Sequence, residues 1–105
     1  VQQELEGSDT TRHLYILRIK PEKLSIDRRE FFDALAAENI MCNVHYIPIY
    51  LQPYYQEMGY PKGLCPKAEK LYSEMMSLPL YYAMTDQDVE DVITAVQKIV
   101  AYYKK

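Results

Sequence analysis

The chain has 105 residues, of which 49% are hydrophobic and 26% charged, the composition of an ordinary globular domain rather than of a disordered or fibrous chain. Its net charge of −3 and isoelectric point near 5.3 provide no general positive field, so we expect no nucleic-acid partner. No apolar run approaches the about 20 residues that a bilayer requires, and the sequence therefore predicts one soluble, cytoplasmic domain with no membrane span.

The two cysteines, Cys42 and Cys65, lie in different segments of the chain. Their separation matches neither a CxxC redox motif nor the paired spacing of a zinc site. We therefore expect two reduced, partly buried thiols, as in a cytosolic protein, and no metal site.

Residues 1–11 are polar and acidic with little apolar content, which is typical of a flexible arm or the remnant of a linker. We therefore place the folded domain at residues 12–105. Its first predicted element is a strand over residues 13–19, where branched and aromatic side chains occupy both faces, and Pro21 ends it.

A helix is predicted next, beginning after Asp27 and ending near Glu38. Asp27 and Glu30 have the spacing of a capping box, and Asn39 suits a left-handed C-terminal cap. The apolar side chains at helical spacing are Phe31, Phe32, Leu35 and Ala36.

A second strand is predicted over residues 41–46, and Pro48 ends it because proline has no N–H to donate. Beyond it, tyrosines alternate with prolines and glycines over residues 50–63. We interpret this stretch as an ordered loop with a short helix over residues 53–58.

The C-terminal part predicts a helix, a short strand over residues 77–80 and a last helix. Pro66 suits the first turn of the earlier helix, and Thr85 with Asp88 forms a capping box for the last one. The apolar face of the earlier helix comprises Ala68, Leu71, Tyr72 and Met75. The stripe of the last helix comprises Val89, Val92, Ile93, Val96, Ile99, Val100 and Tyr103.

Each predicted helix carries one apolar stripe that needs a surface to pack on. The order strand, helix, strand, loop and helix, strand, helix satisfies this need in an α/β fold. We predict a two-layer sandwich with a small, mainly antiparallel sheet packed against helices.

The sequence contains no catalytic signature, because it has no glycine-rich phosphate loop, nucleophile elbow or HExxH motif. We therefore predict no catalytic residue in this chain. His13 has the place of a surface or capping residue at the start of a strand, and the acidic residues after Thr85 are explained by a helix N-terminus rather than by a metal site.

One segment supports an argument for function: residues 43–55, Asn-Val-His-Tyr-Ile-Pro-Ile-Tyr-Leu-Gln-Pro-Tyr-Tyr. A histidine at a strand end, followed by a tyrosine-rich loop broken by proline, presents donors, acceptors and ring faces of the kind that bind sugars or nucleotides. The pattern alone leaves two interpretations open, a packed aromatic loop and the wall of a ligand site.

Further motifs follow downstream, namely Cys65-Pro66, Ala68-Glu69, Ser77 to Leu80 and Met84 to Val89. Together with the run 43–55, they resemble the C-terminal small domain of the DegT/DnrJ/EryC1/StrS sugar aminotransferases over about residues 12–101. Within that family, the run is most similar to transaminases that form UDP-4-amino-4,6-dideoxy-N-acetyl-altrosamine in the pseudaminic acid pathway, and to related surface or spore-coat polysaccharide enzymes. The acceptor that this resemblance implies is of the UDP-4-keto-6-deoxy-hexosamine type.

The resemblance implies a homodimeric parent enzyme in which a large N-terminal domain, missing from this chain, holds pyridoxal phosphate through a lysine. Glutamate, the usual donor in the family, would charge the cofactor, and a keto sugar nucleotide would accept the amine in a ping-pong reaction. No lysine here has the family's cofactor-lysine context. We therefore expect this chain alone to bind no cofactor and to be inactive.

The residues carried over by position as substrate-binding are His45, Tyr46, Ile47 and Pro48. His45 matches the family histidine that faces the sugar-nucleotide site, and the resemblance implies that it orients the substrate rather than transfers protons. The sequence departs from the family at Tyr50, where close relatives often have a second histidine, and at Asn39, where glycine is usual.

An alternative from another class shares the order of strands and helices: a free-standing, ligand-binding regulatory module of ACT or ferredoxin-like type. An RNA-binding version is disfavoured because no strand has the basic-glycine-aromatic run of an RRM. A coding segment upstream of Val1 with a cofactor lysine would decide for the aminotransferase.

Overall fold

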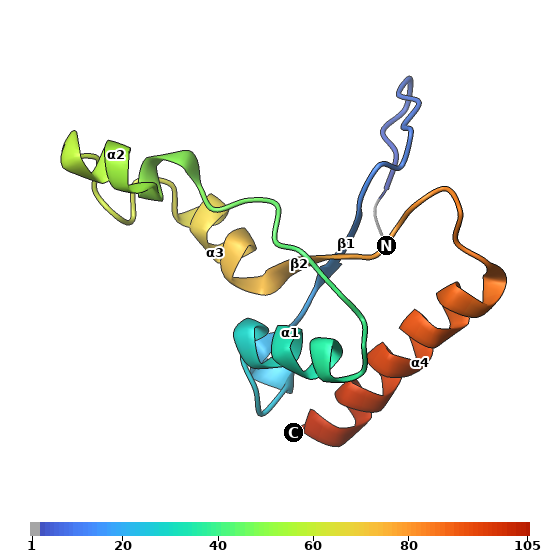
Figure 1. Cartoon of the computed structure of the whole chain (residues 1–105). Helices are drawn as coiled ribbons and strands as arrows, with labels where there is room; N and C mark the ends of the chain where they lie inside the picture. Colours follow the sequence, from blue (N-terminus) through green and yellow to red (C-terminus); the bar gives the residue numbers. More distant parts are fainter. Residues whose placement is uncertain (1–2) are drawn as a thin grey trace.

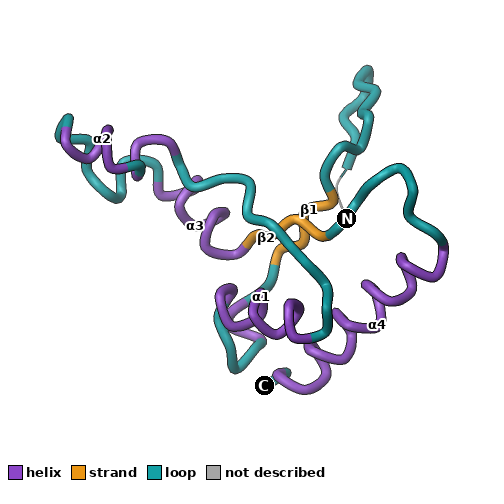
Figure 2. Tube along the Cα trace, viewed as in Figure 1, coloured by secondary structure: helices purple, strands orange, loops and turns teal. Residues whose placement is uncertain are grey.

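The structure is a computed structural model that describes residues 3–105 (Figures 1 and 2). Its sheet has two antiparallel strands, β1 (Tyr15–Arg18) and β2 (Met75–Leu78). Two helices, α1 (Arg28–Ala37) and α4 (Asp86–Tyr103), lie on the same side of these strands in the view of Figure 1. The predicted α/β fold with a small antiparallel sheet and packed helices is confirmed.

Two further helices, α2 (Pro53–Glu57) and α3 (Pro66–Glu74), extend away from the strands (Figure 1). Single 3₁₀ turns occur at Pro21–Lys23 and Ile49–Leu51. The radius of gyration is 15.9 Å, compared with about 13 Å for a compact chain of this length. The molecule is elongated because the α2–α3 projection, residues 49–74, lies outside the core.

The N-terminal segment also leaves the body of the domain at β1 (Figure 1). Glu4 and Arg12 form an ion pair of 3.0 Å across it. Of the predicted flexible arm 1–11, Val1 and Gln2 lie outside the described residues, and the flexibility of the remainder stays a prediction.

Both ends of α1 are formed as its local sequence predicts. Asp27 accepts a hydrogen bond from the Glu30 amide at 2.9 Å, and the Glu30 carboxylate accepts one from the Asp27 amide at 2.8 Å. At the other end, Asn39 adopts the predicted left-handed conformation, with a φ of 61°. The Ile40 amide then donates to the Leu35 carbonyl at 2.9 Å, which is the long hydrogen bond of a Schellman cap.

The N-terminus of α4 is also confirmed. Thr85 and Asp88 form the predicted capping box, in which the Asp88 carboxylate accepts from the Thr85 amide at 2.8 Å.

An ion pair joins α1 to α4. Just after the C-terminal end of α1, both carboxylate oxygens of Glu38 accept from the ammonium group of Lys98 in α4, at 2.7 and 2.8 Å. The two helices are therefore tied by an ion pair at the rim of their contact.

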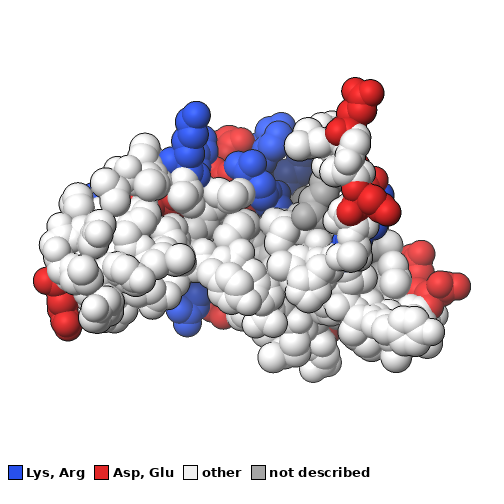
Figure 3. Space-filling model, turned by 90° about the horizontal axis from the view of Figure 1, so that it is seen from above, with Lys and Arg blue, Asp and Glu red and all other residues white. Residues whose placement is uncertain are grey.

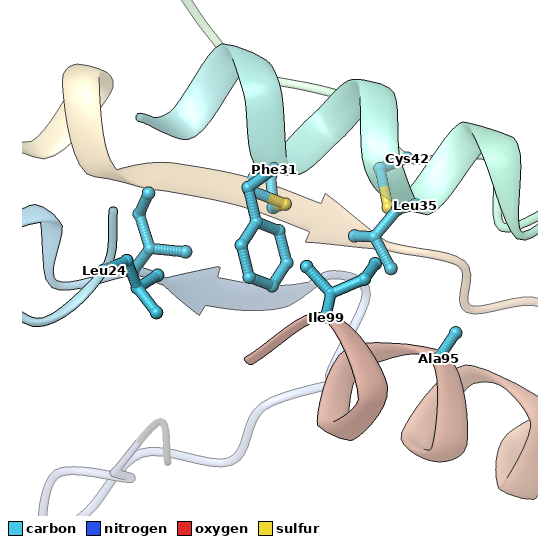
Figure 4. Close-up of a cluster of buried hydrophobic side chains, with 8 residues drawn as sticks. Leu24, Phe31, Leu35, Cys42, Ala95 and Ile99 are labelled. Atoms are coloured by element: carbon cyan, nitrogen blue, oxygen red, sulfur yellow. The ribbon is translucent and has the colours of Figure 1, made fainter. Parts of the chain in front are cut away.

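The core lies between the facing sides of α1 and α4 (Figure 4). Phe31 and Leu35 project from α1 toward Ile99 of α4, and both are fully buried. Met76 of β2, which is also fully buried, closes the cluster. The complete set is Ile19, Leu24, Phe31, Leu35, Cys42, Met76, Ala95 and Ile99.

The predicted stripe of α4 is only partly buried. Its side toward α1 enters the core, whereas Val89, Ile93 and Val100 each retain about 40% exposure. The reason is that α1 covers one side of α4 only, so the stripe is wider than the face it packs on. Val89 and Ile93 line a partly open apolar groove of about 360 Å³ that also includes Tyr15 and Leu80.

The strand predicted over residues 41–46 is wrong. Within that segment only Asn43 pairs, through an isolated bridge to Ser77 with N···O distances of 3.0 and 2.7 Å. β2 also lies two residues earlier than the predicted 77–80, because Pro79 has no N–H with which to continue the ladder. β2 has only four residues, so its free edge is too short for the segment 41–46 to form a continuous ladder along it.

Two predictions about burial on the projection are also wrong. Leu71 and Ala68 of α3 remain exposed, because α3 lies away from the core that its apolar face was expected to cover. Cys65, just before α3, is an exposed free thiol. Cys42 is buried in the core, and burial raises the pKa of its thiol to about 11.

Candidate functional site

The candidate site is the segment His45 to Pro48, which we call the motif wall. It belongs to the loop between the end of α1 and the 3₁₀ turn at Ile49–Leu51, and Figure 2 shows this loop crossing β2. The bridge between Asn43 and Ser77 fixes the chain against the sheet two residues before the wall begins. The wall is therefore irregular in conformation but anchored at one end to regular structure.

His45 is half-buried, and its Nδ1 atom lies 2.8 Å from the hydroxyl oxygen of Ser77. Tyr46 is 74% exposed, and its ring meets the imidazole edge-on, with ring centroids 4.7 Å apart. The peptide bond between these two residues is cis. The wall thus presents one oriented polar ring beside one open aromatic ring.

Ile47 and Pro48 continue the wall as half-buried side chains. The Pro48 carbonyl accepts a hydrogen bond from the Leu51 amide at 2.8 Å, which begins the 3₁₀ turn. The structure therefore places all four predicted residues along one stretch, with the polar contact at His45 and apolar surface after it.

The tyrosine loop beyond the wall is held by a hydrogen-bonded clamp rather than by an apolar core. The Tyr50 hydroxyl donates to the Glu69 carboxylate of α3 at 2.6 Å, and the same oxygen accepts the Gly63 amide at 2.6 Å. The Gln56 amide group donates to the carbonyls of Tyr50 and Tyr60, at 2.6 and 2.8 Å. These bonds join the two ends of the loop and fix it to α3.

The clamp shifts the pKa values of the groups at both of its ends. The hydrogen bond from Tyr50, followed by that from the Gly63 amide, lowers the pKa of the Glu69 carboxyl. Partial burial, followed by the hydrogen bond to Glu69, raises the pKa of Tyr50. Tyr50 thus has a structural partner in Glu69.

The surface around these elements is rich in uncharged side chains. Ile49 is 68% exposed and Tyr54 67% exposed, close to the open ring of Tyr46 in sequence. Figure 3 shows a broad uncharged area on one face, with charged side chains gathered at its edges. Such a surface suits contact with a sugar or base ring, or with another protein surface, better than attraction of a polyanion.

The prominent clefts lie elsewhere. The largest, of about 590 Å³, lies between the end of α1 and α4 and includes Glu38, Asp88 and Lys98. None of the five main clefts formed by residues 3–105 includes the motif wall. Within those residues no group of three or more His, Cys, Asp or Glu side chains is arranged to hold a metal, and no helix is long and apolar enough to cross a membrane.

Sequence reasoning missed Ser77 as a functional candidate and treated it only as part of a strand. Ser77 is 3% exposed, yet it follows two buried methionines. A hydroxyl at a buried strand position needs a hydrogen-bond partner, and that requirement was the available signal. What the sequence lacked was the identity of the partner, His45, 32 residues earlier.

Comparisons with known proteins identify the class to which this domain belongs. The sequence model of the DegT/DnrJ/EryC1/StrS aminotransferase family matches residues 1–97. Over 90 residues the chain is 46% identical to the Bacillus subtilis spore coat polysaccharide biosynthesis protein SpsC, covering 84% of this chain and 23% of that protein.

Two solved structures show the same fold. The PLP form of Spr1654 from Streptococcus pneumoniae, described as a sugar aminotransferase, matches 97% of this chain and 26% of its own, with a TM-score of 0.86 and 28% identity. PseC of Helicobacter pylori, an aminotransferase involved in the biosynthesis of pseudoaminic acid, matches 87% of this chain and 24% of its own, with a TM-score of 0.77 and 25% identity.

These matches define an aminotransferase domain of the kind found in sugar-modifying enzymes. The chain belongs to the DegT/DnrJ/EryC1/StrS aminotransferase family, which confirms the resemblance noted in its sequence motifs. It spans about a quarter of the length of the relatives it matches. Membership of this family favours the interpretation of the chain as an aminotransferase domain over its interpretation as a free-standing regulatory module.

Proposed function

We propose that this chain is the substrate-facing small domain of a pyridoxal-phosphate-dependent enzyme that transfers an amino group from glutamate to a keto sugar nucleotide. The acceptor is of the UDP-4-keto-6-deoxy-hexosamine type, and the product serves surface polysaccharide, spore-coat or pseudaminic acid biosynthesis. In this proposal the whole enzyme is a cytoplasmic homodimer whose large domain holds the cofactor.

The observation that carries the proposal is the geometry of the motif wall. His45 is held by Ser77 while remaining half-exposed, and Tyr46 opens its ring to the outside. An imidazole fixed on one nitrogen and open on the other is suited to orient a polar ligand, and an exposed ring beside it can cover a sugar or base face. The names of SpsC and PseC, which refer to polysaccharide and pseudoaminic acid biosynthesis, support the substrate class.

We propose that the cofactor is not attached to a residue of this chain. A cofactor lysine is activated by a desolvated environment, whereas every lysine between residues 3 and 105 is exposed to solvent. Pyridoxal phosphate would supply the electron withdrawal that amino transfer requires, and we assign its attachment to residues outside this chain. The contribution of this domain is to bind and orient the acceptor substrate.

The experiment uses the full-length enzyme that carries this domain and measures its two half-reactions separately. His45→Ala should lower kcat/KM for the sugar nucleotide by a few-fold to about 100-fold, the range expected for one lost hydrogen bond to a neutral or charged group. The half-reaction with glutamate should remain nearly unchanged, because a ping-pong enzyme meets its substrates separately.

His13→Ala is the matched control, because His13 is the other histidine and lies exposed two residues before β1. It should change neither half-reaction. Equal losses in both half-reactions together with a lower melting temperature would make His45 a structural residue and remove it from the substrate site.

A further inference from the structure

Ser77 occupies one of the most constrained positions in the domain. It lies within β2, opposite Ile16 of β1 in the antiparallel register. On its other side, its amide and carbonyl exchange hydrogen bonds with Asn43, at 2.7 and 3.0 Å. Because neighbours on both sides fix its backbone, the Ser77 hydroxyl has a set position against which the imidazole of His45 is held.

The hydrogen-bond needs of this hydroxyl distinguish between the two neutral forms of His45. Among residues 3–105, the only partner of the Ser77 hydroxyl is the Nδ1 atom of His45, 2.8 Å away. If Ser77 donates, Nδ1 accepts and the ring proton lies on Nε2. If Nδ1 carries the proton and donates instead, the hydroxyl hydrogen of a 3% exposed serine has no acceptor, which is unfavourable.

The other ring nitrogen remains available. Within the described part of the chain, Nε2 of His45 has no hydrogen-bond partner. Among those residues, the only buried side-chain nitrogen or oxygen without a partner is Nε of Arg28, so Nε2 of His45 is not buried. Nε2 is therefore accessible to solvent. A proton on this atom makes His45 a donor toward a ligand that lies against it.

We propose that Ser77 is a positioning residue that holds neutral His45 with its proton on Nε2, so that His45 donates a hydrogen bond to an acceptor oxygen of the sugar nucleotide. This inference rests on the proposed function for the identity of the ligand. The recognised group is an oxygen acceptor, such as a phosphate, carbonyl or sugar oxygen. Ser77 acts through His45 and touches no substrate itself.

The tautomer can be measured without any assay of activity. Nitrogen-15 NMR of the imidazole side chains, recorded on the 105-residue chain at about pH 8.5, where free imidazole is neutral, gives two sets of signals because the chain has two histidines. We expect His45 to have its proton on Nε2 only, and exposed His13 to average over both forms. A proton on Nδ1 of His45 overturns the assignment.

Ser77→Ala tests the cause. His45 should lose its single tautomer in this variant, whereas Ser73→Ala, which removes an exposed hydroxyl bonded to the Lys70 carbonyl, should leave it unchanged. Ser77→Thr keeps the hydroxyl and should restore the Nε2 form. Should Ser77→Ala fold poorly, the tautomer of the unmodified chain still decides the proposal.

The same variants in the full-length enzyme test the ligand contact. Ser77→Ala should lower kcat/KM for the sugar nucleotide by about twofold to tenfold, the range for one neutral hydrogen bond, and leave the glutamate half-reaction unchanged. It should add nothing to His45→Ala in the double variant, because both act through one group. A confirmed Nε2 tautomer with no change in the sugar half-reaction would overturn the substrate contact at His45, whereas a wrong tautomer would overturn only the role of Ser77.

Discussion

Leu35 is the most direct test of how this small domain is held together. Its side chain is fully buried between α1 and α4, and it also lies behind the Schellman cap that ends α1. Leu35→Ala removes buried carbon atoms worth about 0.8 kcal/mol each and leaves a cavity whose walls include other fully buried groups. We expect a loss of about 3 kcal/mol, within the range measured for such substitutions.

For a chain of this length, that loss corresponds to a fall in Tm of roughly 12–15 °C. The free energy of unfolding is measured by urea denaturation followed by far-UV circular dichroism, and the m-value should stay constant. Leu5→Ala is the matched control, because it removes the same atoms from a side chain that is 79% exposed. Its cost should stay within about 0.5 kcal/mol. A cost below about 1 kcal/mol for Leu35→Ala at constant m-value would show that α1 and α4 do not form the core described.

Three further outcomes are expected. Thr85→Ala removes the cap of α4 and should lower the free energy of unfolding by about 1 kcal/mol, and an unchanged urea midpoint would mean that the cap contributes nothing. Because the pKa of Glu69 is lowered in the folded chain, the stability it contributes is present above the ordinary value of about 4.3 and is lost as the pH falls through the folded value. Glu69→Gln and Tyr50→Phe should therefore both make the free energy of unfolding fall less steeply as the pH is lowered. An unchanged slope in both variants would refute the clamp. An aromatic disulfide reagent at about pH 8 should label exposed Cys65 quickly and buried Cys42, whose pKa is about 11, only on unfolding, and equal rates would contradict the buried position.

The features predicted correctly from the sequence are those that depend on local spacing. Asp27 with Glu30, Thr85 with Asp88, and the left-handed Asn39 each satisfy a helix end within a few residues. The partners of such groups lie in the same short stretch of sequence, so no knowledge of the tertiary fold is needed.

The errors arise where an element depends on a distant partner. The segment 41–46 has the composition of a strand, but its partner β2 offers it only Ser77 for pairing. Leu71 has helical periodicity, but the periodicity cannot say that α3 lies off the core. For the candidate site, motif resemblance predicted a substrate-binding role for His45, whereas the contact with Ser77 appears only when two segments 32 residues apart are placed together.

The α2–α3 projection has a different kind of stability from the rest of the domain. Neither of its helices contains a buried residue, and its order depends on hydrogen bonds such as those of Glu69 and Gln56. Such a region can open locally while the core around Phe31 stays intact. Its backbone amides will therefore exchange with solvent through a low-energy opening separate from global unfolding, and a molecule that covers the projection will slow that exchange without altering the exchange of the core.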